Sequence, residues 1–323
     1  MHDSFFCWSL PNSETFHVFT PGGEGVRFRF APFSGKHPSL DFTGTVREVA
    51  RNELHGSIGT LPRCEYQSTS SSKHQQNVAE AVKKIFNGEL DKVVLSTLNV
   101  LPCSVDPFEL IKHLRHSHPG ALVYLVSHPL TGCWAGATPE PLVVGQAGEF
   151  ETVSLAGTRV HELGVHPWGQ KESLEQSIVT DYIKKQLRKA DVTDLKIQRP
   201  ETIRYGNLEH LRSTLRFKSM NIDSVIGALH PTPAVCGVPM GAARLQIGVL
   251  EDHDRKYYTG YVHIERSGAV NCFVNLRCME IFSDAIAVYS GGGITAESDP
   301  NDEWRETRDK IRALLNGFTE IPA

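Results

Sequence analysis

The chain has 323 residues, of which 22% are charged and 40% hydrophobic, an ordinary composition for a globular protein of one large or two small domains. A net charge of -4 and the lack of a basic block exclude a general attraction to nucleic acid. No stretch approaches the roughly 18 apolar residues that a membrane span needs, so no membrane partner is expected.

The cysteines and the first residues indicate the compartment. The seven cysteines include no C-x-x-C pair, and their odd number favours reduced thiols over a disulfide framework or a zinc site. Residues 1–12 lack a basic segment followed by an apolar run, so no signal peptide is expected. The expected location is the cytoplasm.

The first part of the chain predicts short strands and turns. Its apolar stretches are broken by Pro21-Gly22-Gly23, by Pro32 and by Pro38. The polar run 68–72 indicates an exposed loop. We expect residues 1–72 to form a short N-terminal part of the same fold as residues 73–323, which carry the candidate catalytic region.

Helices and strands are mixed in the rest of the chain, according to the spacing of the apolar residues. Helical spacing predicts one helix that ends before Gly88. It predicts further helices over 106–117, 171–188, 221–229, 240–250 and 302–316. Apolar runs predict strands near 92–96, 121–127, 141–145, 149–155, 208–217, 257–265, 269–281 and 285–290. Strands grouped in hairpins, with helices between them, predict a single α+β domain with largely antiparallel sheets.

Two carboxylate pairs, Glu172 with Glu175 and Glu303 with Glu306, have i,i+3 spacing on predicted helices. Each pair would project from one helix face. If the fold brings the faces together, the four charges repel one another unless a divalent cation, most naturally Mg²⁺, lies between them. The alternative is that all four are solvated surface carboxylates.

The last predicted helix adds a cap and a cation to its carboxylates. Asp299 precedes the helix as an N-cap candidate, and Lys310 lies on the same face as Glu303 and Glu306. Lys310 can bind a second negative group, or it can form an i,i+4 salt bridge with Glu306 worth roughly 0.3–0.5 kcal/mol. The spacing is compatible with both interpretations.

Three further segments suit an anionic ligand. Gly291-Gly292-Gly293 ends a predicted strand, where backbone N–H groups can form an anion-binding nest, although a triple glycine can also be a flexible turn. Arg277 lies in a predicted strand that can aim it inward, where it needs an anionic partner. Residues 156–159 close another strand with small residues, which allows close backbone contact with a ligand.

Two residues are candidates for acid–base chemistry. Lys92 begins an apolar strand, where partial burial favours the neutral amine, and Glu140 follows Pro139 on a rigid turn. The alternative for each is an ordinary exposed side chain. His210 and His230 have motif-like surroundings, but a structural histidine explains either one in isolation.

Together these segments resemble the chorismate-utilising enzymes, which include isochorismate, salicylate, anthranilate and aminodeoxychorismate synthases. The matching segments follow the family's order over about 75–312: Asp91–Ser96, Gly136–Glu140, Leu155–Arg159, Lys171–Glu175, Glu209–Leu211, Leu229–Ala234 with Gly237 and Pro239, Arg255–Gly260, Asn275–Arg277, Gly291–Ile294 and Glu303–Lys310. The resemblance implies two stacked, mainly antiparallel β-sheets flanked by helices, with the active site in a central cleft. It also implies a Mg²⁺-dependent reaction on chorismate, a ring with two carboxylates, in a protein that is expected to be a monomer.

The resemblance also assigns roles to residues. Glu175 and Glu303 are expected to bind Mg²⁺ directly, with Glu172 and Glu306 completing the shell through water, so that the metal holds the ring carboxylate. The residues expected to bind chorismate are Arg277, Tyr258, Lys310 and the backbone of Gly291 and Gly293 at the enolpyruvyl carboxylate, Gly157 and Thr158 at the ring, and His210.

Lys92 separates two reactions within the family that the chain resembles. Members that add ammonia carry glutamine at this position, whereas members that add water carry lysine, because the attacking water must lose a proton. We therefore expect Lys92 to activate water for attack at C2 of chorismate, and Glu140 to protonate the departing C4 hydroxyl. Ala156 stands where aminodeoxychorismate synthases carry lysine, which argues against that branch. The expected product is isochorismate, by a net isomerisation.

Some positions depart from the family pattern, namely Thr97, Gln176, Cys236 and His263. None of them has a role carried over from the family. Two other functions stay open: a salicylate synthase that also removes pyruvate from isochorismate, and a non-catalytic homologue that binds a metabolite. The second should have lost a catalytic or metal residue, and all are present. The product could feed menaquinone or siderophore synthesis, and the compact chain favours menaquinone.

Overall fold

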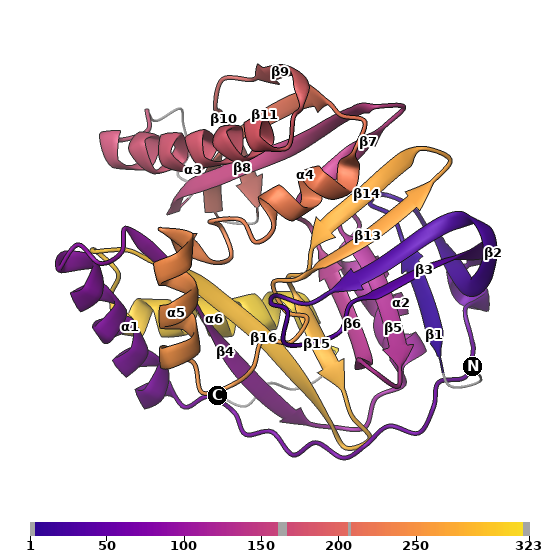
Figure 1. Cartoon of the computed structure of the whole chain (residues 1–323). Helices are drawn as coiled ribbons and strands as arrows, with labels where there is room; N and C mark the ends of the chain where they lie inside the picture. The colour runs from indigo at the N-terminus through magenta and orange to yellow at the C-terminus, as the bar shows by residue number, and fades with distance from the viewer. Residues whose placement is uncertain (1–3, 161–166, 206–207, 319–323) are drawn as a thin grey trace. The chain divides into compact units, whose positions relative to one another are not determined.

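Antiparallel pairing joins the strands of the chain, as the alternation of apolar residues predicts (Figure 1). The structure is a computed structural model that describes residues 4–160, 167–205 and 208–318. Two compact units can be separated, each with strands and helices of its own. The first comprises Met1–Glu140, Cys236–Ile264 and Phe273–Ala323, and the second Pro141–Val235 and Glu265–Cys272.

The first unit is built on an antiparallel sheet. Its strands are β1 (Phe5–Ser9), β2 (Thr15–Ala31), β3 (Leu40–Ala50), β4 (Lys92–Pro102), β5 (Leu122–His128), β6 (Gly132–Thr138), β12 (Gly237–Val238), β15 (Cys278–Ile281) and β16 (Ala285–Ile294). They pair in the order β2-β1-β5-β6-β15-β16-β4-β12, and β3 also pairs with β2. The hairpin of β13 (Tyr261–Arg266) and β14 (Ala269–Val274) belongs partly to each unit.

Side-chain caps mark the starts of several helices in the first unit. Its helices are η1 (Arg51–Glu53), α1 (Ser71–Phe86), α2 (Pro107–Ser117), α5 (Met240–Leu250) and α6 (Pro300–Leu315). The side chains of Ser70, Asp106 and Asp299 accept hydrogen bonds from backbone N–H groups of the first turns of α1, α2 and α6. The cap predicted at Asp299 is confirmed.

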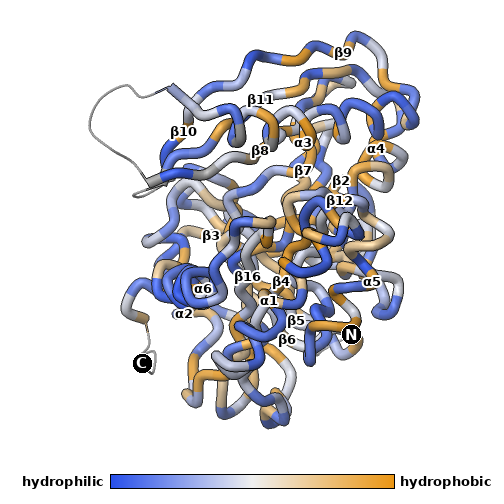
Figure 2. The backbone as a smooth tube through the Cα atoms, turned by 90° about the vertical axis from the view of Figure 1, so that its left-hand side faces the viewer, coloured by the Kyte–Doolittle hydropathy of each residue, from blue (hydrophilic) through white to orange (hydrophobic). Residues whose placement is uncertain are grey.

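Two apolar clusters hold these helices to the sheet. One joins α2 and α6 to β5, β6, β15 and β16, and includes Leu110, Leu125 and Ile311. The other joins α1 and α5 to β4, and includes Leu95 and Ile247. In Figure 2 the turns of α6 are mostly hydrophilic, so only a narrow apolar face of this helix reaches the core and its charged faces are left for other contacts.

The second unit also contains antiparallel strands and, within its described residues, two helices. Its strands are β7 (Pro141–Gln146), β8 (Glu149–Val160), β9 (Thr193–Ile197), β10 (Glu201–Tyr205) and β11 (Leu208–Lys218), paired in the order β10-β11-β8-β7 with β9 also on β11. The helices are α3 (Gln170–Lys189) and α4 (Ile222–Leu229). Val179, Ile183 and Leu187 of α3 are buried, since this helix packs on β8 and β11.

Several predicted boundaries are wrong for local reasons. Strand β2 continues through Pro21-Gly22-Gly23, because an irregularity between Pro21 and Val26 lets it keep pairing with β3. The predicted loop 68–72 ends early, since α1 begins at Ser71. The predicted strand 257–265 begins only at Tyr261, because residues before it form a turn in which Tyr258 N–H donates to Arg255 O at 2.8 Å.

The predicted strand 269–281 is two strands, β14 and β15, with a bend at Arg277 between them. Asn275 makes the interruption, since its side-chain amide donates to Tyr257 O at 2.8 Å and its Oδ1 accepts from the Tyr124 hydroxyl at 2.6 Å. Arg277 has a left-handed φ of 48°. The prediction that Arg277 lies within a strand is therefore wrong.

The cysteines are free thiols, five of them buried. Among the described residues, no helix combines the length and the apolar character that a membrane crossing requires.

Candidate active site

Lys92 lies at the start of β4, in the first unit, between two strands. Its neighbour Val93 pairs with Ile294 of β16, and Lys92 itself pairs with Val238 of β12. The side chain is half-buried and lies across Gly293, because a Cβ atom placed on that glycine would be 2.7 Å from Lys92 Cε and 3.1 Å from Nζ. Gly293 therefore leaves the space that the lysine side chain occupies.

Glu140 belongs to the same unit and lies two residues after the end of β6, beyond Pro139. Its carbonyl oxygen accepts a hydrogen bond from Val274 N–H at 3.0 Å, which holds the turn. Burial raises the pKa of the Glu140 carboxyl to about 7, against the opposing attraction of Lys92, Arg277 and Lys310. A carboxyl with this pKa can hold a proton near neutral pH and can therefore act as an acid.

Arg277, Lys92 and Lys310 all act electrostatically on Glu140, so the first unit gathers three predicted cations around the predicted acid. The bend at Arg277 is held by Ala137, whose N–H donates to Arg277 O at 3.0 Å. This arrangement places three cationic side chains near the predicted acid, where they can attract a negatively charged ligand.

Tyr258 is buried and presents its hydroxyl to the glycine segment. Its ring stacks on Tyr289 with centroids 5.4 Å apart, and a Cβ atom on Gly291 would lie 2.8 Å from its hydroxyl oxygen. Burial raises the pKa of Tyr258 above its ordinary value, so the phenol stays neutral and can donate a hydrogen bond.

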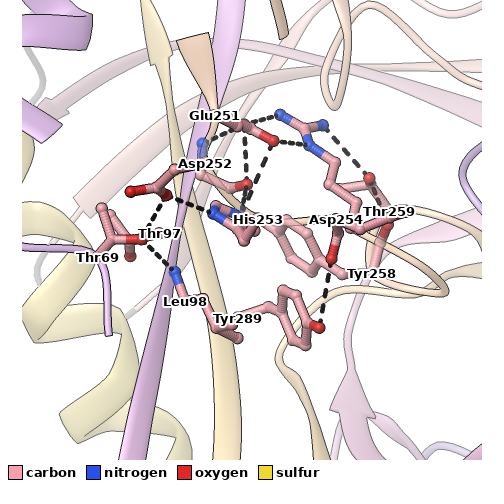
Figure 3. A network of polar contacts seen from close by, with 12 residues as sticks. Thr69, Thr97, Leu98, Glu251, Asp252, His253, Asp254, Tyr258, Thr259 and Tyr289 are labelled. Atoms are coloured by element: carbon pink, nitrogen blue, oxygen red, sulfur yellow. Dashed lines mark hydrogen bonds and ion pairs between the residues drawn. The ribbon is translucent and has the colours of Figure 1, made fainter. Parts of the chain in front are cut away.

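A buried polar network holds the segment that carries Tyr258 against β4 (Figure 3). Arg255 forms two hydrogen bonds with Glu251, of 2.8 and 2.5 Å, and donates to Val94 O at 2.7 Å. Glu251 Oε1 also accepts from the backbone N–H and hydroxyl of Ser96, at 2.7 and 2.9 Å. Burial opposes the charge of Glu251, but the Arg255 guanidinium outweighs it and lowers the pKa of this carboxyl. The pair thereby anchors Tyr258 to the strand that begins with Lys92.

The glycine segment is extended strand and not the predicted nest or turn. Gly291, Gly292 and Gly293 belong to β16 and pair with Ser96, Leu95 and Val94 of β4. An anion-binding nest needs a residue with positive φ, and none of the three glycines has one. The glycines instead form a strand surface without side chains, on which functional groups lie.

The carboxylates of α6 lie over this surface. A Cβ atom on Gly292 would be 2.8 Å from Glu303 Oε2 and 3.7 Å from Glu306 Oε1. Lys310 Nζ forms the alternative i,i+4 ion pair with Glu306 at 2.6 Å, and donates to Gly291 O at 2.7 Å. Burial, aided by repulsion from Glu306, raises the pKa of Glu303, although Ser298, Lys310 and Lys92 lower it.

The second unit contains the remaining predicted residues. Gly157 has a φ of 67°, and a Cβ atom there would be 3.1 Å from Glu172 Cβ, so these two residues are neighbours. His210 pairs with Thr158 across β11 and β8. The side chains of Thr158 and Glu175 lie outside the described part of the structure.

Gln176, which departs from the family pattern, anchors α3 to the sheet. Its side-chain amide is buried and donates to Ser154 O and Ser213 Oγ, both at 3.1 Å. The sequence pattern of a partly polar helix did not indicate this role. The sequence also gave no sign of two other contacts, Ser298 with Glu303 (i,i+5) and Glu251 with Arg255 (i,i+4). Polar pairs with these spacings are common on protein surfaces, so the spacing alone does not indicate a role.

The donor atoms for a cation are oxygens. Glu303 and Glu306 supply two neighbouring carboxylates over a glycine, and this donor set fits Mg²⁺, which prefers oxygen ligands. No group of three or more metal-binding side chains is present within the described residues, which exclude the side chain of Glu175.

The chain is similar to a known enzyme family over most of its length. The family model of chorismate binding enzymes matches residues 48–319. The chain belongs to this family. Isochorismate synthase EntC of Escherichia coli K12 is 30% identical over 311 residues, covering 89% of this chain and 79% of the relative.

A solved structure confirms the predicted fold. MenF, the menaquinone-specific isochorismate synthase of Escherichia coli, has a TM-score of 0.78 at 21% identity, covering 98% of this chain and 89% of that chain. The reaction is not decided by similarity alone. Anthranilate synthase component 1 of Streptomyces coelicolor is 29% identical over 301 residues, covering 87% of this chain and 57% of the relative.

Proposed function

We propose that this protein is an isochorismate synthase, which adds water to C2 of chorismate and removes the C4 hydroxyl. The observation that carries the proposal is Lys92, lying across Gly293 and acting electrostatically on Glu140, whose pKa is about 7. A glutamine at this position could not accept a proton from water, whereas a neutral lysine amine can.

The proposed reaction balances in protons and oxygen atoms. Lys92 accepts a proton from water as the water oxygen bonds to C2, and the ring double bonds shift. The C4–O bond breaks, and Glu140 donates its proton to the departing hydroxyl, which leaves as water. Lys92 ends protonated and Glu140 ionised, so one proton returns from the amine to the carboxyl, through solvent, before the next turnover.

In this proposal, the cations of the first unit bind the enolpyruvyl carboxylate of the substrate. Arg277 and Lys310 supply positive charge, and the neutral Tyr258 hydroxyl supplies a hydrogen-bond donor beside Gly291. Lys310, now paired with Glu306, would turn toward the carboxylate. In the second unit, Gly157, Thr158 and His210 would border the ring.

Mg²⁺ would be held by Glu303 and Glu175 directly, and by Glu172 and Glu306 through water. When bound, this ion supplies the positive charge that holds the ring carboxylate of chorismate. The repulsion between Glu303 and Glu306 supports the assignment, because it is a cost that a cation relieves.

The test is to incubate the protein with chorismate and Mg²⁺, with and without ammonium, and to separate the products by chromatography. We expect isochorismate in reversible balance with chorismate, blocked by EDTA and unchanged by ammonium. Salicylate with pyruvate would assign the protein to the lyase branch. An aromatic amine that needs ammonium would overturn the role of Lys92.

A further inference from the structure

Ser298 lies in the turn between β16 and α6, and its hydroxyl has a defined direction. It accepts a hydrogen bond from Thr295 N–H at 3.1 Å, and its single proton is donated to Glu303 Oε1 at 2.6 Å. This short distance is typical of a hydroxyl bound to an ionised carboxylate. The turn is closed by Ser298 N–H, which donates to Thr295 O at 3.2 Å.

The two oxygens of Glu303 are therefore not equivalent. Oε1 is bound by Ser298, whereas Oε2 lies over Gly292, on the side where Glu306 Oε1 is found. The rotation of the carboxylate is set before any ligand binds, because the Ser298 hydroxyl is itself held by the backbone. Only Oε2 is directed toward the neighbouring carboxylate.

We infer that Ser298 is a positioning residue for a divalent cation, which orients Glu303 so that Oε2 is presented as a ligand. This inference rests on the proposed function, in which Glu303 binds Mg²⁺. Groups that orient a metal ligand contribute to affinity because the ligand loses less freedom on binding, and removing one typically costs 10- to 100-fold in metal affinity or activity.

The test compares wild type with Ser298→Ala, Ser298→Thr and Ser290→Ala. The last is a matched control, since the Ser290 hydroxyl donates to Thr307 O of the same helix at 3.1 Å. The dissociation constant of Mg²⁺ is measured by calorimetry without chorismate, and the Tm is measured in EDTA. The Mg²⁺ concentration for half-maximal turnover gives a second value of the affinity.

We expect Ser298→Ala to weaken Mg²⁺ binding about 10-fold or more, with kcat largely recovered at saturating Mg²⁺. Ser298→Thr should restore most of the affinity, and Ser290→Ala should lower the Tm while leaving the affinity within about 2-fold. A lower Tm for Ser298→Ala with unchanged Mg²⁺ affinity would overturn the inference and leave the proposed function intact. Wild type that binds no Mg²⁺ in either assay would overturn both the inference and the metal assignment.

Discussion

Helix α6 in the first unit and helix α3 in the second begin with the same signal, two carboxylates three residues apart, but they are held in different ways. Asp299 caps α6 with two hydrogen bonds, and Ser298 binds Glu303 directly. The N-cap of α3 is Gly169, which offers no side-chain cap, and the helix is anchored by Gln176 in its second turn.

The same spacing of two carboxylates on a helix can therefore be held in place in two different ways. In the first unit the carboxylate oxygens themselves are oriented, as are Lys92 and Tyr258 over neighbouring glycines. In the second unit Gln176 fixes the position of the helix on β8 and β11. Changes at Lys92 and Gly293 in the first unit should therefore act mainly on chemistry, and changes at Gln176 in the second mainly on stability.

The largest expected effect is that of Lys92→Ala. We expect kcat to fall by about 10²–10⁴-fold, because the proton acceptor for water is lost, while the dissociation constant for chorismate stays within a few-fold. Stopped-flow binding and steady-state kinetics measure the two quantities. Lys112→Ala, which removes a half-buried lysine paired with Glu109 on α2, is the control. A kcat near wild type would remove Lys92 from the chemistry.

A smaller loss is expected for Gly293→Ala, which places a methyl group 2.7 Å from Lys92 Cε. The lysine end can move aside, so the fold should tolerate the change, but a displaced base should lower kcat by about 10–100-fold. Gly227→Ala on α4, with open space around the added atom, should leave kcat unchanged. If both variants keep full activity, the glycine does not position Lys92.

The pH dependence of stability tests the environment of Glu140. Its folded pKa of about 7 is above the ordinary value of 4.5, so the ionised form is disfavoured in the folded state. The free energy of unfolding of wild type, relative to that of Glu140→Gln, should therefore fall as the pH rises from about 4.5 to 7. At pH 8 the loss should amount to about 1–3 kcal/mol. Urea unfolding at pH 5 and pH 8 measures this, and an equal difference at both values would contradict it.

Gln176→Met tests the support of the second unit. The change keeps the volume but leaves Ser154 O and Ser213 Oγ without this donor, which should lower the free energy of unfolding by about 1–2 kcal/mol. Ser177→Ala, at the neighbouring exposed position, should change it by less than about 0.5 kcal/mol. If Gln176→Met instead changes kcat without changing stability, the contrast between the two units is wrong.

Local patterns predicted the elements well, because the spacing of apolar residues depends on which face is buried. The N-cap at Asp299 and the neighbouring strands predicted at 141–145 and 149–155 both depend on nearby residues alone, and both are found. The positions of Lys92 and Glu140 made them candidates for acid–base chemistry, and the resemblance to a family supplied the role expected of each.

What the sequence did not indicate depends on distant partners. The three glycines look like a turn, and only their pairing with β4, about 200 residues earlier, makes them a strand. Arg277 leaves the strand because Asn275 is bound by Tyr124 and Tyr257. Ser298 could have been noticed as a hydroxyl just before the Asp299 cap, but its bond to Glu303 requires the folded turn.

The measurement that tests the central claim most directly is a single turnover of chorismate with Mg²⁺ in ¹⁸O-labelled water containing ammonium. If Lys92 directs water to C2, mass spectrometry will find isochorismate with one ¹⁸O atom at C2 and no amine. Isochorismate without the label, or an aminated product, would contradict the account.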